Sequence, residues 1–243
     1  MRVLPTIFLS LFLFMVACST SETEPDPTDL TLDQILERTR DAMSEVTAYK
    51  TIGEFAWIYD GVDGYTVSGN LNTAWQAPDD FISTQERLEP QESELDVQTA
   101  EFRHVRGRTF VLFDTSHEWQ EAPRIQGQGP QPIPHREIID SIPWSISPAT
   151  LQFESRGELN LAIIGFVRVG ISASGHHFDR FETLVVDTVT WRFVEHSTRE
   201  VIESSVLGTS KGRQQKPRPK SGQDYTSTYY DDNVPNVIEA PIP

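Results

Sequence analysis

The hydrophobic positions of this chain follow a helical period before about residue 48 and a period of two after it. The helical stripe is Leu32, Ile35, Leu36, Thr39, Met43 and Val46. Thr31 can cap this segment, and Gln34 three residues later completes a capping box. We therefore expect an amphipathic helix that packs its apolar stripe against another part of the fold.

An alternating pattern with many aromatic residues follows the predicted helix. Residues 53–59 and 65–75 alternate apolar with polar or small side chains, and the turn-forming stretch 61–64 separates them. This pattern predicts a long β-hairpin with one aromatic face. The residues predicted on that face, which are also the candidates for a ligand-binding cavity, are Phe55, Trp57, Tyr59, Tyr65, Val67, Leu71 and Trp75. Taken one by one, they fit ordinary core residues better, and the cavity is the alternative interpretation of the face as a whole.

Further alternating segments predict more strands. They cover residues 81–88, 97–105, 109–113, 151–155, 159–173, 181–194, 201–207 and 225–230. In 159–173 we expect one apolar face made of Leu159, Leu161, Ile163, Val167, Val169 and Ile171. A stretch rich in Pro, Gly and Gln at 122–134 interrupts the strands. It leads into a short helix at 136–142, and Ser147-Pro148 can begin another helical turn.

Short connections between successive strands favour an antiparallel meander that curls. The predicted fold is therefore α+β and mainly β. It is a curled antiparallel sheet, with an N-terminal amphipathic helix and short helices covering the concave face.

The N-terminus has the pattern of an export signal. Residues 3–16 are mostly apolar and follow Arg2, but they are fewer than the roughly 20 residues that a membrane-spanning helix needs. Met15-Val16-Ala17-Cys18 resembles a bacterial lipobox, although that pattern prefers Leu where Met15 stands. The resemblance implies cleavage before Cys18, the only cysteine, and attachment of lipid to its thiol. The alternative is an ordinary secreted protein with an incidental cysteine.

Three segments follow from this interpretation. Residues 1–17 are a lipoprotein signal peptide, 18–29 are the lipidated cysteine and a polar tether, and 30–243 are a single domain. The expected location is the extracytoplasmic face of a cell membrane or an outer membrane, with the acyl chains as the anchor.

The net charge of the chain limits the classes of partner that it can bind. A formal net charge of −16 argues against binding to nucleic acid. One segment is locally basic, with Lys211, Arg213, Lys216, Arg218 and Lys220. It is either a solvated loop or a docking segment for anionic lipid headgroups. Changing all five residues to Ser and measuring how strongly the protein binds anionic vesicles distinguishes the two.

The sequence offers little for catalysis. It contains no Gly-x-Ser-x-Gly elbow and no phosphate-binding loop, and its one cysteine is assigned to the anchor. The adjacent pair His176-His177 would point to opposite sides of a strand, so a polar turn is the simpler interpretation. We expect neither an enzyme nor a cofactor nor a metal site.

Several features in order resemble the LolA-like superfamily of envelope lipoprotein carriers and its lipid-binding LppX/LprG-type branch. They are the lipobox, the helix ending in "MSEVTAYKTIGEF", the predicted strand pair "VTWRFVEHSTREVI" and the closing "YTSTYYDDNVPNVIEAP". In the strand pair, the resemblance places a turn at Glu195-His196-Ser197-Thr198 after Trp191. The closing segment matches the family pattern at Tyr230, Pro235, Ile238, Glu239 and Pro241. The segment 208–224 and the loop before Arg136 depart from the family pattern.

The resemblance implies a half-open antiparallel β-barrel with helices over a hydrophobic cavity that holds lipid or the acyl chains of lipoproteins. The expected function is binding and transfer of a lipid or acylated ligand at the cell envelope. The alternative is an envelope interaction or sensor module that binds a protein partner on the same fold and transports nothing.

Overall fold

The structure is a computed structural model that describes residues 26–59, 65–78, 80–89, 99–116, 118–122, 135–171, 177–203, 221–230 and 232–241. The chain divides into two compact units, Met1–Leu30 and Thr31–Pro243. In the first unit, Pro27–Asp29 forms a single 3-10 turn (η1) whose N-terminus is capped by the Asp26 side chain. All other elements belong to the second unit.

The predicted N-terminal helix is present as α1, Leu32–Ser44. Both halves of its capping box are formed, with the Thr31 backbone N–H donating to Gln34 Oε1 (2.8 Å) and the Gln34 backbone N–H donating to Thr31 Oγ1 (3.4 Å). The stripe predicted from the helical period supplies its buried residues Ile35, Leu36, Thr39 and Met43. The amphipathic helix is confirmed.

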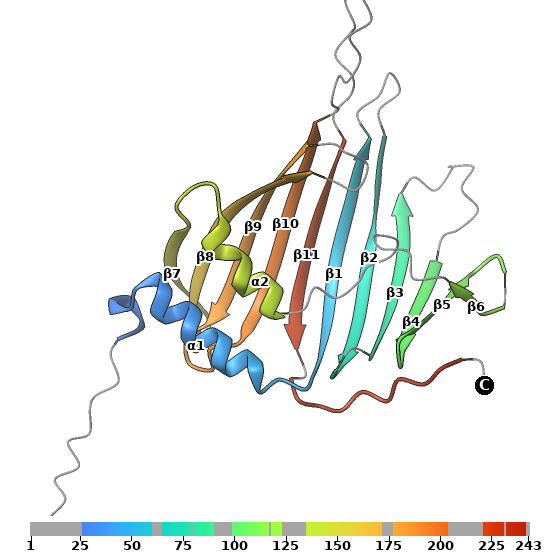
Figure 1. The fold of residues 1–243 in the computed structure, drawn as a ribbon, viewed down its shortest axis with the longest axis horizontal. Coiled ribbons are helices and arrows are strands. Elements are labelled where there is room, and N and C mark those ends of the chain that lie inside the picture. Colours follow the sequence, from blue (N-terminus) through green and yellow to red (C-terminus); the bar gives the residue numbers. More distant parts are fainter. Residues whose placement is uncertain are drawn as a thin grey trace, which may run out of the picture. The chain divides into compact units, whose positions relative to one another are not determined.

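The strands form one eleven-stranded antiparallel sheet in the order β6-β5-β4-β3-β2-β1-β11-β10-β9-β8-β7. Their bounds are β1 Ala48–Tyr59, β2 Tyr65–Gln76, β3 Asp80–Glu89, β4 Thr99–Val105, β5 Arg108–Phe113, β6 Gln120–Ala122, β7 Thr150–Arg156, β8 Leu159–Ile171, β9 His177–Asp187, β10 Phe193–Glu203 and β11 Ser221–Tyr230. Two meanders, β1 to β6 and β7 to β11, join where β1 pairs with β11. The end strands β6 and β7 do not pair with each other, so the curled sheet stays open (Figure 1).

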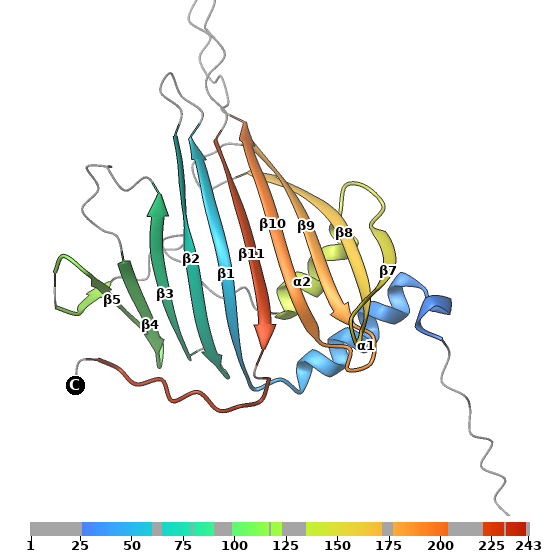
Figure 2. The ribbon, with the colours of Figure 1, turned by 180° about the vertical axis from the view of Figure 1, so that it is seen from behind.

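Helices cover one face of the sheet on its β7–β11 half. α1 and α2 (His135–Ser141) lie in front of this half in Figure 1 and behind it in Figure 2. α2 continues into the 3-10 turn η2, Ile142–Trp144. Strand residues on the covered face are almost completely buried: Ala162, Ile164, Leu184 and Val186. We call this the inner face and the opposite one the outer face. The predicted mainly β fold with helices over one face is confirmed.

In β8 the residues predicted to share one face do share it, and Leu161 among them is buried. That face is the outer one, and the inner face carries the intervening positions Ala162, Ile164 and Phe166. Val169 lies on the outer face and is about half exposed. The helical turn predicted to begin at Ser147-Pro148 is wrong: Ser147 lies in a bend, Pro148 has no regular structure, and the extra helical turn occurs earlier, at Ile142–Trp144.

The predicted turn at Glu195–Thr198 is also wrong, because these residues lie inside β10. The chain turns earlier, between β9 and β10. Asp187 organises that turn by accepting hydrogen bonds from the backbone N–H groups of Val189 (3.1 Å) and Thr190 (3.2 Å). The polar run therefore continues the strand and places its alternate side chains on the inner face.

The C-terminal segment 232–241 is tied across the ends of β1 and β2. The Asn233 backbone N–H donates to the Ala48 carbonyl (2.8 Å). Asn236 Nδ2 donates to the carbonyls of Tyr49 (3.3 Å) and Trp75 (2.8 Å). Arg103 then donates to the Glu239 carbonyl (3.3 Å). These bonds hold the end of the chain along one rim of the sheet, as Figure 1 shows.

Candidate ligand-binding face

The aromatic positions predicted from the alternating pattern do share one face. Phe55 pairs in register with Gly69, Trp57 with Val67, and position 59 with position 65. Gly53 pairs with Leu71 and Tyr49 with Trp75 on the same face. Since β1 also pairs with β11, this surface continues through Tyr225 opposite Phe55. It is the same inner face that the helices cover farther along the sheet.

Five of these inner-face residues form one apolar cluster, which we call the apolar patch. Phe55, Val67 and Leu71 are its buried members, and the partly buried Trp57 and Tyr225 pack against them. The rings of Phe55 and Trp57 are 4.9 Å apart. The structure thus brings together four of the seven predicted cavity residues and adds Tyr225, which the sequence analysis did not single out.

Trp75 belongs to a different contact. Its ring stacks on Tyr49 at 5.0 Å, and Tyr49 also lies 5.4 Å from Tyr229. Burial raises the pKa of both tyrosine hydroxyls well above the ordinary value, so they stay protonated at neutral pH. Trp75 therefore supports the packing next to the patch and is not part of it.

A charged network that the sequence analysis missed lies on the same face of β8, β9 and β10. Arg168 donates to Glu182 through Nε and pairs with the same carboxylate through a terminal nitrogen. His196 Nε2 lies 3.0 Å from the other oxygen, Glu182 Oε2. The carboxylate is fully buried. Burial, the largest influence, raises the Glu182 pKa, but the hydrogen bond from His196 and the charge of Arg168 outweigh it, so the pKa lies below the ordinary value.

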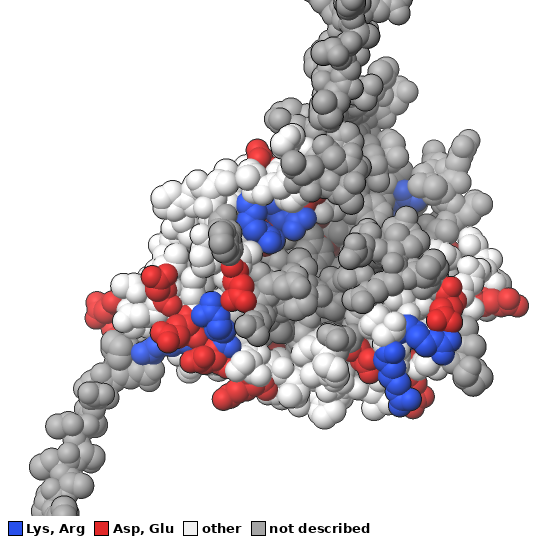
Figure 3. Space-filling view, viewed as in Figure 1, with Lys and Arg blue, Asp and Glu red and all other residues white. Residues whose placement is uncertain are grey.

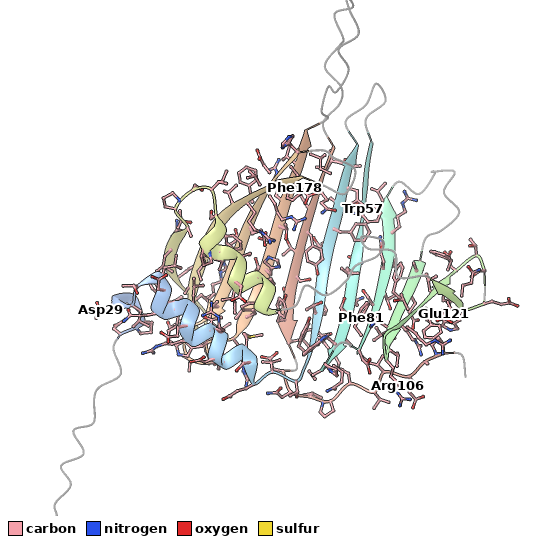
Figure 4. The ribbon with its side chains drawn as sticks, in the orientation of Figure 1. Asp29, Trp57, Phe81, Arg106, Glu121 and Phe178 are labelled. Atoms are coloured by element: carbon pink, nitrogen blue, oxygen red, sulfur yellow. The ribbon has the colours of Figure 1, made fainter. Side chains whose placement is uncertain are left out.

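A second ion pair adjoins this network. Arg180 donates to Glu200 through Nε (2.8 Å) and through a terminal nitrogen, and its guanidinium lies 5.2 Å from the centre of the Phe178 ring. Figure 3 shows a basic patch over β9 and β10, on the face that carries the helices. In Figure 4, Phe178 and Trp57 lie near the same end of the sheet. Charged and aromatic groups therefore line neighbouring parts of one surface.

The described contacts do not assemble a nucleophile and a base. Ser227 is directly opposite His196 in register, but its hydroxyl donates to the Tyr225 hydroxyl. Both Ser227 and His196 are about 1% exposed, so neither could meet a substrate without a local opening. Within the part of the chain that the structure describes, no group of three or more His, Cys, Asp or Glu side chains could hold a metal ion.

Other predicted positions lie outside the described residues. They are Cys18, the basic positions Lys211, Arg213, Lys216, Arg218 and Lys220, and His176. His177 is exposed at the start of β9. No helix in the described ranges is both long enough and apolar enough to cross a bilayer.

A weak signal for the charged network was present in the sequence. Arg180 and Glu182 are two residues apart, as are His196 and Thr198, which is the spacing of one strand face. Polar residues at this spacing resemble a solvent-facing strand or a turn when their partners are unknown. The bonded residues are 14 and 20 positions apart, so only the strand register reveals the pairs.

No family model matches the sequence, and no curated protein matches it. The fold is similar to solved structures. LprF from Mycobacterium bovis is similar over 86% of this chain and 95% of that protein, at 12% identity and a TM-score of 0.44. A LolA superfamily protein from Nitrosomonas europaea is similar over 86% and 95%, at 12% identity and a TM-score of 0.31. A putative outer membrane lipoprotein-sorting protein domain from Vibrio parahaemolyticus is similar over 84% and 94%, at 9% identity and a TM-score of 0.33.

These likenesses concern the fold alone. The strand order defines the class of structure as an unclosed, curled antiparallel sheet, with helices over part of its inner face. The predicted curled antiparallel sheet is present, and the resemblance to the LolA-like superfamily stays a prediction.

Proposed function

We propose that this protein is a lipid-anchored extracytoplasmic lipoprotein that binds a lipid or acyl chain on its inner face and transfers it within the cell envelope. One observation carries the binding proposal. The apolar patch, with Trp57 and Tyr225 at its partly exposed edge, lies on the inner face of an open sheet, while the described helices cover the other half of that face. The anchor is proposed from the pattern at Cys18.

The energetics of such a face suit a carrier. An acyl chain of about 15 methylenes gains roughly 12 kcal/mol on leaving water, at about 0.8 kcal/mol per CH₂. It gains almost nothing relative to a bilayer, because the hydrocarbon surroundings are equivalent. A protein of this kind can therefore take a lipid from one membrane and release it to another without a large change in free energy.

Native mass spectrometry of the unaltered chain, purified from membranes in a mild detergent, tests the proposal. We expect a retained lipid mass, and a mature chain that begins at Cys18 and carries an acylated thiol. Trp57→Ala should lower lipid retention several-fold, because Trp57 contributes apolar contact at the edge of the patch.

Trp119→Ala is the matched control, since that ring lies against Arg103 and outside the patch. Equal lipid retention by both tryptophan variants would contradict the proposed site. A chain that retains no lipid would favour the alternative, an envelope module that binds a protein partner. Movement of a labelled lipid between donor and acceptor vesicles separates transfer from storage.

A further inference from the structure

Two arginines occupy directly opposed positions on the inner face. Arg168 of β8 and Arg180 of β9 are Cα partners in the register. Like charges placed opposite each other on neighbouring strands repel and destabilise a sheet. Each arginine here has its own carboxylate, Glu182 for Arg168 and Glu200 for Arg180. The two acids offset the repulsion and fix both guanidinium groups in place.

Neither guanidinium is saturated by its carboxylate. A guanidinium has five N–H donors, and among the described residues each of these two bonds a single carboxylate through Nε and one terminal nitrogen. Both arginine side chains are 25% exposed, whereas the Glu182 and Glu200 side chains are 0% and 8% exposed. The cationic groups are therefore partly accessible to solvent while their counter-ions are buried.

This geometry suits one oxyanion. Paired positions on adjacent strands place the two side chains about 5 Å apart at their bases. Guanidinium groups on two side chains with that spacing at their bases can each bond an oxygen of the same phosphate or carboxylate group, the kind of anion that arginine matches best.

The arginine pair lies in register with the edge of the apolar patch. Trp57 pairs with Gln223, Gln223 with Glu200, and Glu200 with Arg180. Three strand spacings therefore separate Trp57 from Arg180, or roughly 14 Å at about 4.8 Å per strand. One amphiphile can span both places, with its charged end at the arginines and its tail on the patch.

We propose that the inner face selects an anionic amphiphile, whose phosphate or carboxylate is bound by Arg168 and Arg180 and whose tail lies on the apolar patch. This inference rests on the proposed function and specifies the ligand class.

Competition between defined lipids tests this selectivity. The full chain, freed of co-purified lipid by detergent exchange, is incubated with equal amounts of dioleoyl phosphatidic acid, oleate, dioleoyl phosphatidylcholine and diolein. Glycerol 3-phosphate serves as a probe that has the phosphate but no tail. We expect native mass spectrometry to show at least tenfold more phosphatidic acid or oleate than diolein, and no retained glycerol 3-phosphate.

The double variant Arg180→Gln/Glu200→Gln removes one of the two cations without leaving an unpaired buried carboxylate. It should reduce the preference for anionic lipid to twofold or less while diolein retention stays unchanged. Arg199→Gln is the control, because Arg199 lies next to Glu200 on β10 but on the outer face, with its Nε 3.8 Å from Asp224. This control should keep the wild-type preference.

The outcomes separate the two proposals. Equal retention of anionic and neutral lipids by the wild type overturns the anionic selectivity but leaves lipid binding intact. The anionic selectivity is also overturned if the double variant retains less of every lipid class to the same extent while its melting temperature is unchanged. Retention of glycerol 3-phosphate as strong as that of phosphatidic acid would identify a site for free phosphate esters instead. If the wild type retains no lipid, the proposed function itself fails.

Discussion

Glu182 is the most buried carboxylate among the described residues. Its side chain is fully buried, and Arg168 and His196 bond its two oxygens. Removing one partner of a buried ion pair typically costs about 3–5 kcal/mol, because the remaining charge is left unpaired. The network therefore stabilises the particular alignment of β8, β9 and β10 that also presents Arg168.

Glu182→Gln should lower the free energy of unfolding by roughly 2–3 kcal/mol at pH 7, since the amide keeps some hydrogen bonds but loses the charge. The folded-state pKa of Glu182 lies below its ordinary value of about 4.5. Its ionisation thus stabilises the fold fully above pH 4.5, and this contribution is lost as the pH falls through the folded-state pKa. Urea unfolding at pH 7 and pH 3.5 should show the gap between wild type and variant narrowing in acid.

Glu121→Gln provides the comparison for this pH effect. Glu121 also pairs with an arginine, Arg108, whose hydrogen bond lowers its pKa, but its side chain is about half exposed. Solvent screens that pair, so the stability change should be much smaller. A gap for Glu182→Gln that stays constant between the two pH values would contradict the assigned ionisation.

The turn between β9 and β10 determines which residues of β10 face inward. Asp187 is buried and accepts from the backbone N–H groups of Val189 and Thr190 and from the Thr190 hydroxyl (2.6 Å). Trp191 then adopts a positive φ of 58°, with the Arg38 guanidinium of α1 5.0 Å from its ring centre. The turn thus connects the strand register to the helix that covers the inner face.

Asp187→Ala should destabilise the protein by about 1–3 kcal/mol, because it removes the charged acceptor of the two turn N–H groups and of the Thr190 hydroxyl. Urea unfolding of the full chain measures this change. Glu158→Ala is the control, since Glu158 is exposed in the β7–β8 turn. If Asp187→Ala lowers the free energy of unfolding no more than Glu158→Ala does, the Asp187 hydrogen bonds do not stabilise the turn.

The turn between β9 and β10 was not predictable from the sequence. Alternation predicted the β1–β2 hairpin and its aromatic face, because residues that face a core are apolar whichever partners they have. It failed for β10, where "EHSTRE" looks like a polar turn. His196 and Glu200 are tolerated on the inner face only because Glu182 and Arg180 arrive beside them from β9. A pattern read along one strand contains no information about the pairing partner, so the apolar half of the face was predictable and the charged half was not.

At the scale of the whole sheet, neighbouring strands approach one another closely at several glycines. Gly69 of β2 is one such place. A Cβ atom built there would lie 2.0 Å from the Glu86 carbonyl oxygen of β3 and 2.6 Å from the Phe55 ring. Glycine permits β3 and the aromatic ring to come this near, as is usual where backbones approach closely. The shape of the sheet and the position of the apolar patch are therefore coupled at this residue.

Gly69→Ala should consequently affect stability and ligand binding together. We expect a loss of about 1–3 kcal/mol in the free energy of unfolding, from overpacking against β3, and a several-fold loss of lipid retention, because the Phe55 ring must move. Gly165→Ala is the matched control. A Cβ there would meet only the Thr150 hydroxyl oxygen, at 2.7 Å, and a side-chain hydroxyl can rotate away. Urea unfolding and native mass spectrometry of both variants make the comparison. A Gly69→Ala protein that is destabilised yet retains lipid like the wild type would show that the curvature at β2 and the binding surface are independent.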